Sequence, residues 1–215
     1  MITLSISIFS YNRHEMLFET ISDLSPYLEK KSINVFISDD SDISCEDALR
    51  SKFPLLFSNY KLFYKHNRVQ LGHDLNCIQA LKLANGNFTW LVGDSIVINQ
   101  KNIEALVKFL DGDNFDAVIV KKIPKYWFSR SVDGFSKDRS YENAGLFYND
   151  YGWYCTLSGA TIYNTKQLQK LLRKDVGSTY IGSDFIQTGL LFELCDKKNI
   201  NVKIFKLDMI NASKG

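Results

Sequence analysis

The sequence predicts an α/β fold, with a mostly parallel central sheet and helices on both of its faces. Strand-like and helix-like segments alternate through the first half of the chain with short connections, the order expected of a parallel sheet with right-handed crossovers. Polar residues follow several of these strands directly. The 215 residues, 45% of them hydrophobic, are enough to bury a substantial core.

The first strand is predicted over residues 2–8, where isoleucine and leucine alternate with serine and threonine. A helix can still cover the small hydroxyl residues of its second face, so this strand can lie in the middle of the sheet. The helix that follows has Leu17, Ile21 and Leu24 on one face, and we expect it to end near Pro26–Tyr27.

The next elements continue this alternation. In chain order they are strand 33–37, helix 45–53, strand 62–64, helix 71–82, strand 88–92, helix 103–110 and strand 117–120. In the second half we expect strand 158–163, helices 165–173 and 183–194, and a last strand over 202–205. The chain ends soon after that strand, which leaves open a truncation at the C-terminus.

Between residues 124 and 156 the regular pattern fails, and the segment is instead rich in Phe, Tyr and Trp interleaved with charged residues. A long irregular segment in a compact domain is usually a functional loop or lid. Aromatic rings beside polar groups suit the apolar faces and the hydroxyls of sugars. For any single ring, however, we expect simple packing within the segment.

Three polar clusters follow strands of the predicted sheet: residues 10–13, residues 39–42, and Asp94–Ser95 after the buried strand 88–92. The carboxyl ends of parallel strands meet at one edge, where open α/β sheets bind their ligands. The pattern therefore predicts a nucleotide or phosphate site at this edge. On position alone, Asp94 or Ser95 serves equally well as a helix cap.

Charge and cysteine content argue against several other functions. A net charge of +2 without a run of Lys or Arg gives no support for nucleic-acid binding. The four cysteines lie far apart without a CxxC pair, which argues against a zinc site and a disulfide framework and is typical of a cytosolic protein. His14, His66 and His73 have no mutual metal-ligand spacing, so we expect them in polar loops or on helix surfaces.

The amino terminus lacks the basic region of a signal peptide. No run approaches the roughly 18–20 apolar residues that span a bilayer. We therefore expect a cytoplasmic protein and leave open a peripheral contact with the inner face of the membrane.

Four motifs in the first hundred residues resemble those of family 2 glycosyltransferases of the GT-A fold, of the kind that builds bacterial surface polysaccharides. SISIFSYNR at residues 5–13 resembles the family's opening strand, and FISDDSD at residues 36–42 resembles its hydrophobic-D-D-G-S turn. Residues 67–88 resemble its N…G…N…A…A-x-G segment, and WLVGDS at residues 90–95 resembles its W-hydrophobic-L-G-D-D-D form. Residues 155–195 resemble the acceptor half more loosely.

The resemblance implies roles for particular residues. Asp39 would accept a hydrogen bond from the nucleobase, most naturally the N3–H of uracil, so a UDP-sugar is favoured as donor. Asp94 would hold a divalent cation, Mn²⁺ or Mg²⁺, that bridges the two phosphates. Asp184 is the candidate general base, with a helix N-cap as the alternative role. The expected substrate-binding residues are Phe9, Ser10, Tyr11, Arg13, Asp39, Asp40, Asn67, Arg68, Asn76, Gly93, Asp94 and Ser95.

One departure from the family pattern matters. The DDD motif reads Asp94-Ser95-Ile96 here, which leaves a single carboxylate and should weaken metal binding. Three alternatives follow. Asp94 and the diphosphate suffice with water, or basic side chains such as Arg68, Lys121 or Lys122 replace the ion, or the domain is a degenerate partner of an active transferase.

The leading functional hypothesis is transfer of a sugar from a nucleotide-diphosphate sugar to a saccharide or lipid-linked acceptor, with inversion at the anomeric carbon. Residues 1–121 would bind the nucleotide sugar, and residues 122–215 would form the acceptor side of the same domain. The alternative is a catalytically silent sugar-nucleotide or glycan-binding module. A nucleotidyltransferase ranks last because residues 9–13 contain no glycine for the usual phosphate loop.

Overall fold

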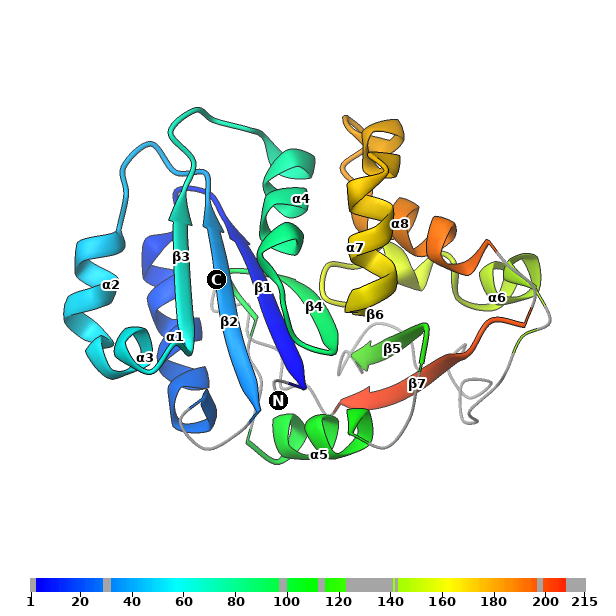
Figure 1. The fold of residues 1–215 in the computed structure, drawn as a ribbon, viewed down its shortest axis with the longest axis horizontal. Coiled ribbons are helices and arrows are strands. Elements are labelled where there is room, and N and C mark those ends of the chain that lie inside the picture. Colours follow the sequence, from blue (N-terminus) through cyan, green and yellow to red (C-terminus); the bar gives the residue numbers. More distant parts are fainter. Residues whose placement is uncertain are drawn as a thin grey trace.

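The computed structural model describes residues 3–28, 32–96, 100–111, 115–122, 141, 143–196 and 199–207. These residues build a seven-stranded sheet in the order β3-β2-β1-β4-β6-β5-β7 (Figure 1). The strands are β1 (Leu4–Ser10), β2 (Ile33–Asp39), β3 (Leu62–His66), β4 (Phe88–Gly93), β5 (Ala117–Lys122), β6 (Thr161–Asn164) and β7 (Val202–Leu207). The predicted α/β fold is confirmed.

The sheet is parallel except at β6, which lies between β4 and β5 and pairs antiparallel with both. The helices are α1 (His14–Leu28), α2 (Glu46–Lys52), α3 (Pro54–Ser58), α4 (His73–Leu83), α5 (Gln100–Leu110), α6 (Ala144–Tyr151), α7 (Thr165–Arg173) and α8 (Ile186–Cys195). Two short 3₁₀ helices span Tyr154–Thr156 and Val176–Tyr180. Strands from both halves of the sequence therefore form one continuous sheet.

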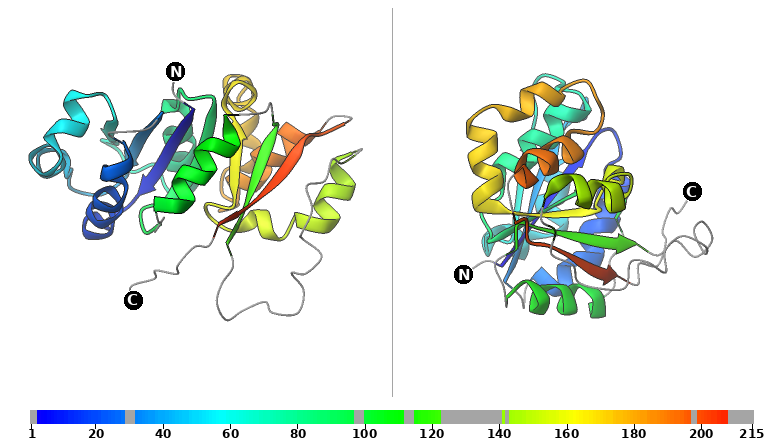
Figure 2. Two further views of the ribbon diagram at one scale, coloured as in Figure 1. Left: turned by 90° about the horizontal axis from the view of Figure 1, so that it is seen from below. Right: turned by 90° about the vertical axis from the view of Figure 1, so that its right-hand side faces the viewer.

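Alternating strand residues build a separate core on each face of the sheet. On β4, Trp90 and Val92 pack into the core that α1, α2, α3 and α5 share, whereas Leu91 faces the core of α4, α6, α7 and α8. Figure 2 shows the sheet between these two layers of helices. The serine-bearing face of β1 lies against α4, as expected for a central strand with a small second face.

The structure corrects several boundaries. Helix α1 continues to Leu28 with Pro26 inside it, and the hydroxyl of Ser25 donates to the Ser22 carbonyl, the acceptor that a residue with an N–H at position 26 would use. Helix α3 was not predicted, although Pro54 occupies its first turn, where proline is tolerated. Strand β6 begins at Thr161 rather than at residue 158.

Part of the segment predicted to be irregular is the helix α6. The rings of Tyr141, Phe147, Tyr151 and Tyr154 are buried in the core beneath α8, so packing is the role of these four rings. Trp153 is about half exposed. The other aromatic and charged residues of this segment, from 124 to 140, lie outside the described residues.

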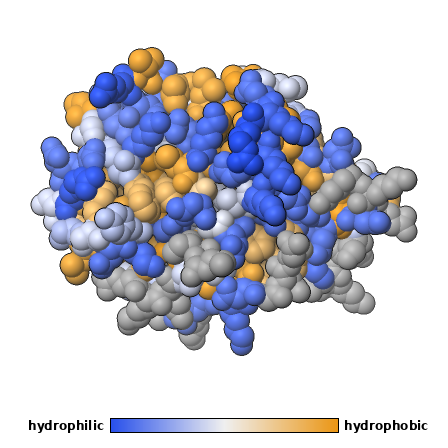
Figure 3. Space-filling view, viewed as in Figure 1, coloured by the Kyte–Doolittle hydropathy of each residue, from blue (hydrophilic) through white to orange (hydrophobic). Residues whose placement is uncertain are grey.

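None of the helices in the described part of the chain is long and apolar enough to cross a membrane. Figure 3 shows hydrophobic and hydrophilic residues interspersed over the face seen in Figure 1. Exposed hydrophobic side chains include Ile43, Leu55, Tyr60 and Val69. A peripheral membrane contact stays a prediction.

Candidate functional site

The three predicted polar clusters lie at one edge of the sheet. Strands β1, β2 and β4 are parallel, and their register places Ser10 beside Asp39 and Phe9 beside Gly93. Each strand ends at this edge, so the turns that follow come together there. The edge therefore carries the acidic and hydroxyl side chains that the sequence places after each strand.

Asp94 lies just past the end of β4 and is 3% exposed. Its Oδ1 pairs with the guanidinium of Arg13 at 3.1 Å, and its Oδ2 accepts from the Ser10 hydroxyl at 3.0 Å. The Thr20 hydroxyl donates to the Asp94 carbonyl at 2.7 Å. Burial raises the pKa of Asp94 above its usual range, although Arg13 and Ser10 favour the ionised form. A buried carboxylate with a raised pKa beside a partly exposed cation is typical of a functional position.

Asp39 ends β2 and is fully buried. Its Oδ1 accepts from the backbone N–H and the hydroxyl of Ser41, and its Oδ2 accepts from the Tyr64 hydroxyl at 2.5 Å. Cys45 Sγ and His14 Nε2 also lie near Oδ2, at 3.7 Å and 3.3 Å. Burial raises the pKa of the Cys45 thiol to about 11, and it raises the pKa of the Tyr64 hydroxyl well above its usual value. Both groups therefore carry their protons at neutral pH. His14 lies beside the carboxylate oxygen Oδ2 of Asp39.

Asn12 joins the turn after β1 to the turn after β2. Its φ of 52° lies in the left-handed region, which asparagine adopts more readily than most residues. Its side chain exchanges two hydrogen bonds with Asp42, and its backbone N–H donates to Ser41 Oγ at 2.7 Å. A cavity of about 590 Å³ opens beside this junction, lined by Asn12, Arg13, His14, Glu15, Met16, Asp42 and Ile43.

Asp40 fixes the loop that leads into α4. Its carboxylate accepts from the backbone N–H groups of Leu71 and Gly72 at 2.8–3.0 Å. Gly72 has a φ of 79°, a conformation that favours glycine. The amide of Asn67 donates to Asp40, and it also donates to Asn76, which in turn donates to the Ser10 carbonyl. These contacts make Asp40, Asn67 and Asn76 the frame of the site, while their predicted substrate contacts stay predictions.

Asp184 lies on the loop before α8, and its side chain is 80% exposed. Its backbone is in the left-handed region, with φ 60°, and α8 begins only at Ile186 after an N-cap residue, Phe185, that makes no side-chain cap. The predicted alternative of a helix cap at Asp184 is therefore wrong. The carboxylate is exposed to solvent and lies 4.0 Å from His73 Nδ1.

Asp74, in the first turn of α4, binds the backbone of this loop. Its Oδ2 accepts from three consecutive backbone N–H groups, those of Gly182, Ser183 and Asp184, at 2.8, 3.0 and 3.1 Å. Its Oδ1 lies 3.1 Å from His73 Nδ1. Burial alone would raise the pKa of Asp74, but the hydrogen bonds from His73 and from the loop lower it below its usual range.

The remaining predicted residues lie around this frame. The Phe9 ring packs edge-on against His73, at 5.2 Å between centroids, and Tyr11 and Ser95 are exposed. Arg68 is exposed on the loop after β3. The side chains of Lys121 and Lys122, predicted as substitutes for a metal, lie outside the described residues.

The residues around Asp94 satisfy the minimum for a divalent cation. Mg²⁺ is commonly held by one or two carboxylates together with substrate phosphates and water, so a single carboxylate is enough when a diphosphate is present. Ile96 is buried and offers no ligand atom, and Ser95 offers only a hydroxyl. Arg13 pairs with Asp94 and also contacts Met16 Sδ, and its side chain is 47% exposed.

Sequence reasoning missed the residues that hold the site residues in place. Asp74 bonds Asp184 across 110 positions of sequence and Tyr64 bonds Asp39 across 25, whereas Ser41, which also bonds Asp39, belongs to the predicted cluster 39–42. The only local signal was the position of Asp74 in the first turn of a helix, where acidic residues are common for another reason. Cys45 and His14 join Asp39 only through the tertiary fold.

The fold and the acidic edge of the sheet define the class: this is an α/β sheet of the GT-A type. Solved structures share the fold over most of the chain. S. aureus TarS 1–349 matches with a TM-score of 0.65 at 18% identity, covering 94% of this chain and 58% of that one. The mannosyltransferase PcManGT from Pyrobaculum calidifontis, solved with GDP-Man and Mn²⁺, matches with a TM-score of 0.57 at 15% identity, over 94% of this chain and 56% of that one.

The sequence comparison is more specific. The model of glycosyl transferase family 2 matches residues 5–172, and the chain belongs to that family. The abequosyltransferase RfbV of Salmonella typhimurium strain LT2 is 29% identical over 110 residues, which are 50% of this chain and 32% of that protein. The chain therefore spans about a third of this relative's length and somewhat over half of the TarS fragment.

Proposed function

We propose that this chain transfers a sugar from a nucleotide-diphosphate sugar to a saccharide or lipid-linked acceptor in the synthesis of a surface polysaccharide. Membership of glycosyl transferase family 2 supports the reaction class. Among proteins of the same fold, TarS has been solved with UDP and with UDP-GlcNAc. The observation that carries the proposal is Asp184, an exposed carboxylate on a loop whose backbone donates three hydrogen bonds to Asp74 of α4.

The donor nucleotide would lie across the ends of β1, β2 and β4. Asp39 would accept the N3–H of a uracil once His14 moves aside, which favours UDP over GDP. The guanidinium of Arg13 would leave Asp94 for the diphosphate, because a doubly charged phosphate group is the stronger partner for a half-exposed arginine. With Asp94 thus released, its carboxylate and the diphosphate oxygens would hold Mg²⁺ or Mn²⁺, which would neutralise the departing diphosphate.

The transfer itself needs a base on the face of the sugar opposite the diphosphate. Asp184 would accept the proton of the acceptor hydroxyl while that oxygen forms a bond to the anomeric carbon. The bond from the anomeric carbon to the diphosphate oxygen breaks, and the diphosphate keeps the electron pair. Attack from the opposite face inverts the anomeric configuration. The loop would contribute to the rate by positioning Asp184. A base held within reach of the acceptor hydroxyl makes proton transfer effectively unimolecular instead of bimolecular.

The first experiment separates binding from chemistry. Calorimetric titration with UDP, TDP, CDP and GDP, each with and without Mn²⁺ or Mg²⁺, identifies the base and the role of the cation. We expect UDP to bind most tightly, and we expect metal to strengthen its binding in the wild type but not in Asp94→Ala. Asp184→Asn should keep UDP affinity and lose sugar transfer by about 10²–10⁴-fold, the usual contribution of a general base. Asp23→Asn, a change at an exposed carboxylate on α1, is the matched control.

The alternative is a catalytically silent module, and the Asp94-Ser95-Ile96 sequence is the observation in its favour. It predicts that nucleotide or glycan binds without turnover and that Asp184→Asn changes nothing measurable. If no nucleotide binds to the wild type under any metal condition, the transferase proposal fails for this chain.

A further inference from the structure

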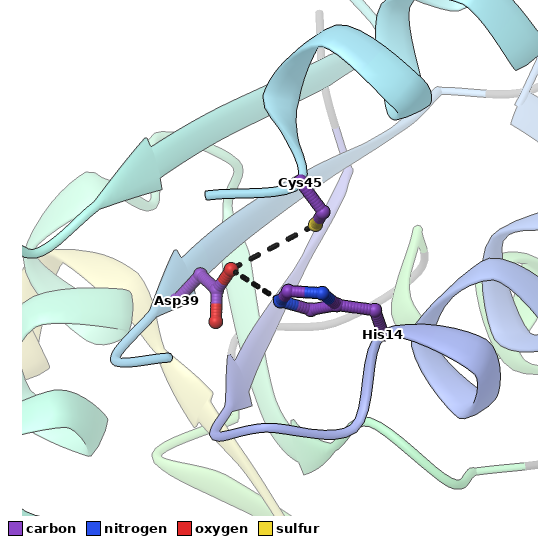
Figure 4. A group of neighbouring side chains, drawn as sticks. All are labelled: His14, Asp39 and Cys45. Atoms are coloured by element: carbon purple, nitrogen blue, oxygen red, sulfur yellow. Dashed lines mark hydrogen bonds and ion pairs between the residues drawn. The ribbon is translucent and has the colours of Figure 1, made fainter. Parts of the chain in front are cut away.

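We propose that His14, Asp39 and Cys45 form a zinc site next to the proposed nucleobase position. The three residues come from different elements: His14 begins α1, Asp39 ends β2, and Cys45 precedes α2. Figure 4 shows His14 and Cys45 approaching the carboxylate of Asp39 from two sides. Their ligand atoms Nε2, Oδ2 and Sγ all lie within 4.8 Å of one another.

The two distances from Asp39 Oδ2 to the other ligand atoms fit a tetrahedral zinc ion. Zinc binds imidazole nitrogen and carboxylate oxygen at about 2.0–2.2 Å and thiolate sulfur at about 2.3 Å. A tetrahedral angle of about 109° then places nitrogen and oxygen about 3.4 Å apart and sulfur and oxygen about 3.6 Å apart. The structure has 3.3 Å between His14 Nε2 and Asp39 Oδ2, and 3.7 Å between Cys45 Sγ and Asp39 Oδ2.

The imidazole of His14 supplies a second observation. Its Nε2 atom is buried and makes no hydrogen bond within the described residues, although it points at Asp39. At 3.3 Å the two atoms are close enough for an ion pair, but their orientation does not suit a hydrogen bond. A buried nitrogen without a partner is costly, and a metal ion between Nε2 and Oδ2 would satisfy it.

The surroundings of the cluster also suit a metal. Ser41 holds Oδ1 of Asp39 and Tyr64 holds Oδ2, the kind of outer hydrogen bonds that orient ligating carboxylates. A set of imidazole, thiolate and carboxylate donors selects zinc over magnesium or calcium, which prefer oxygen ligands. His14 lines the cavity beside α1, so one of the three ligand residues borders open space. Binding would release the thiol proton of Cys45 to solvent.

A zinc ion here would compete with the nucleotide. It would occupy Oδ2 of Asp39, the atom that the proposed function assigns to the nucleobase, so zinc would inhibit donor binding. This consequence rests on the proposed function, whereas the metal site itself does not. The sequence argued against a zinc site because it contains no CxxC pair and no metal-ligand spacing among its histidines. It gave no sign of this site because His14, Asp39 and Cys45 come together only in the folded chain.

Titration of the reduced protein with Co²⁺, a spectroscopic substitute for zinc, tests the site. We expect a sulfur-to-cobalt charge-transfer band in the wild type that zinc abolishes. Cys45→Ser should lose the band, and His14→Gln, a change at a partly exposed side chain, should weaken Co²⁺ binding at least tenfold. Cys195→Ser, which removes another buried thiol, in the other core, is the matched control and should keep the band. Thermal melting of each variant checks that it is folded.

Two results would overturn the site: no thiolate band in the wild type, or a band that persists in Cys45→Ser. The competition is tested by titrating UDP with and without one equivalent of zinc. Zinc should raise the apparent Kd for UDP at least tenfold in the wild type and leave it unchanged in Cys45→Ser. If zinc leaves the apparent Kd for UDP unchanged in the wild type, the proposed competition is wrong. A wild type that binds cobalt through Cys45 but never binds UDP supports the metal site and refutes the proposed function instead.

Discussion

Replacing Asp74 by alanine should detach the loop that carries the proposed base. The carboxylate accepts three backbone N–H bonds from residues 182–184 at 2.8–3.1 Å. A hydrogen bond to a charged group contributes about 1.5–3 kcal/mol, and water can reach this exposed loop to replace part of that, so we expect a loss of about 2–4 kcal/mol of local stability. A misplacement of about 1 Å can cost about 10²-fold in rate, and kcat should fall by that order while nucleotide affinity changes little.

Two measurements separate this from a general loss of folding. Hydrogen exchange at the amides of residues 182–184 should become faster in Asp74→Ala while exchange in β1 and β4 stays slow. Turnover of the nucleotide sugar should fall in Asp74→Ala but not in Asp47→Ala, which removes an exposed first-turn carboxylate from α2. If exchange at the loop and kcat both match the wild type, Asp74 does not position the base.

The stabilisation by Asp74 should also depend on pH. Hydrogen bonds lower its folded-state pKa below the unfolded value of about 3.9. A carboxylate with a lowered pKa stabilises the fold above the unfolded pKa and loses that contribution as pH falls through the folded pKa. Wild type and Asp74→Asn should therefore differ most in stability above about pH 4 and converge in stronger acid. A difference that is constant from neutral pH into acid would contradict this assignment.

The other predictions concern single contacts, each measured as the free energy of unfolding in urea. Asp94→Asn should leave stability unchanged or raise it at pH 7, because burial raises the Asp94 pKa and the ionised form is the costly one; a clear loss would contradict this. Gly189→Ala should cost about 1–3 kcal/mol, since a Cβ there would lie 2.3 Å from the Tyr180 ring, and adding Tyr180→Ala should recover part of it. Trp90→Phe should cost about 1–3 kcal/mol by leaving the Gly159 carbonyl without its indole donor.

The fold was readable from local patterns because most of its elements are amphipathic or buried in a regular way. The alternation of β1 and the apolar run of β4 identified two central strands, and helix α7 was predicted with its observed bounds, Thr165–Arg173. Asn164, whose side chain accepts from Gln167 N–H, caps that helix, so its start had a local signal. Helix α6 has a similar N-cap, Asn143, whose side chain accepts from Leu146 N–H, but it had no predicted periodic pattern, and its rings Phe147 and Tyr151 are buried in the core with α8.

The sequence by itself determined the chemistry of the edge. Residues 10–13, Asp39 and Asp94 each lie at or just past the end of a strand. Parallel strands present such residues at one edge, so their gathering followed from strand order alone. Only the tertiary structure decided their partners. Asp74 supports Asp184 across 110 positions, and His14 faces Asp39 and Cys45 from another element. Contacts of this kind depend on where helices lie over the sheet, which periodicity along a single chain does not encode.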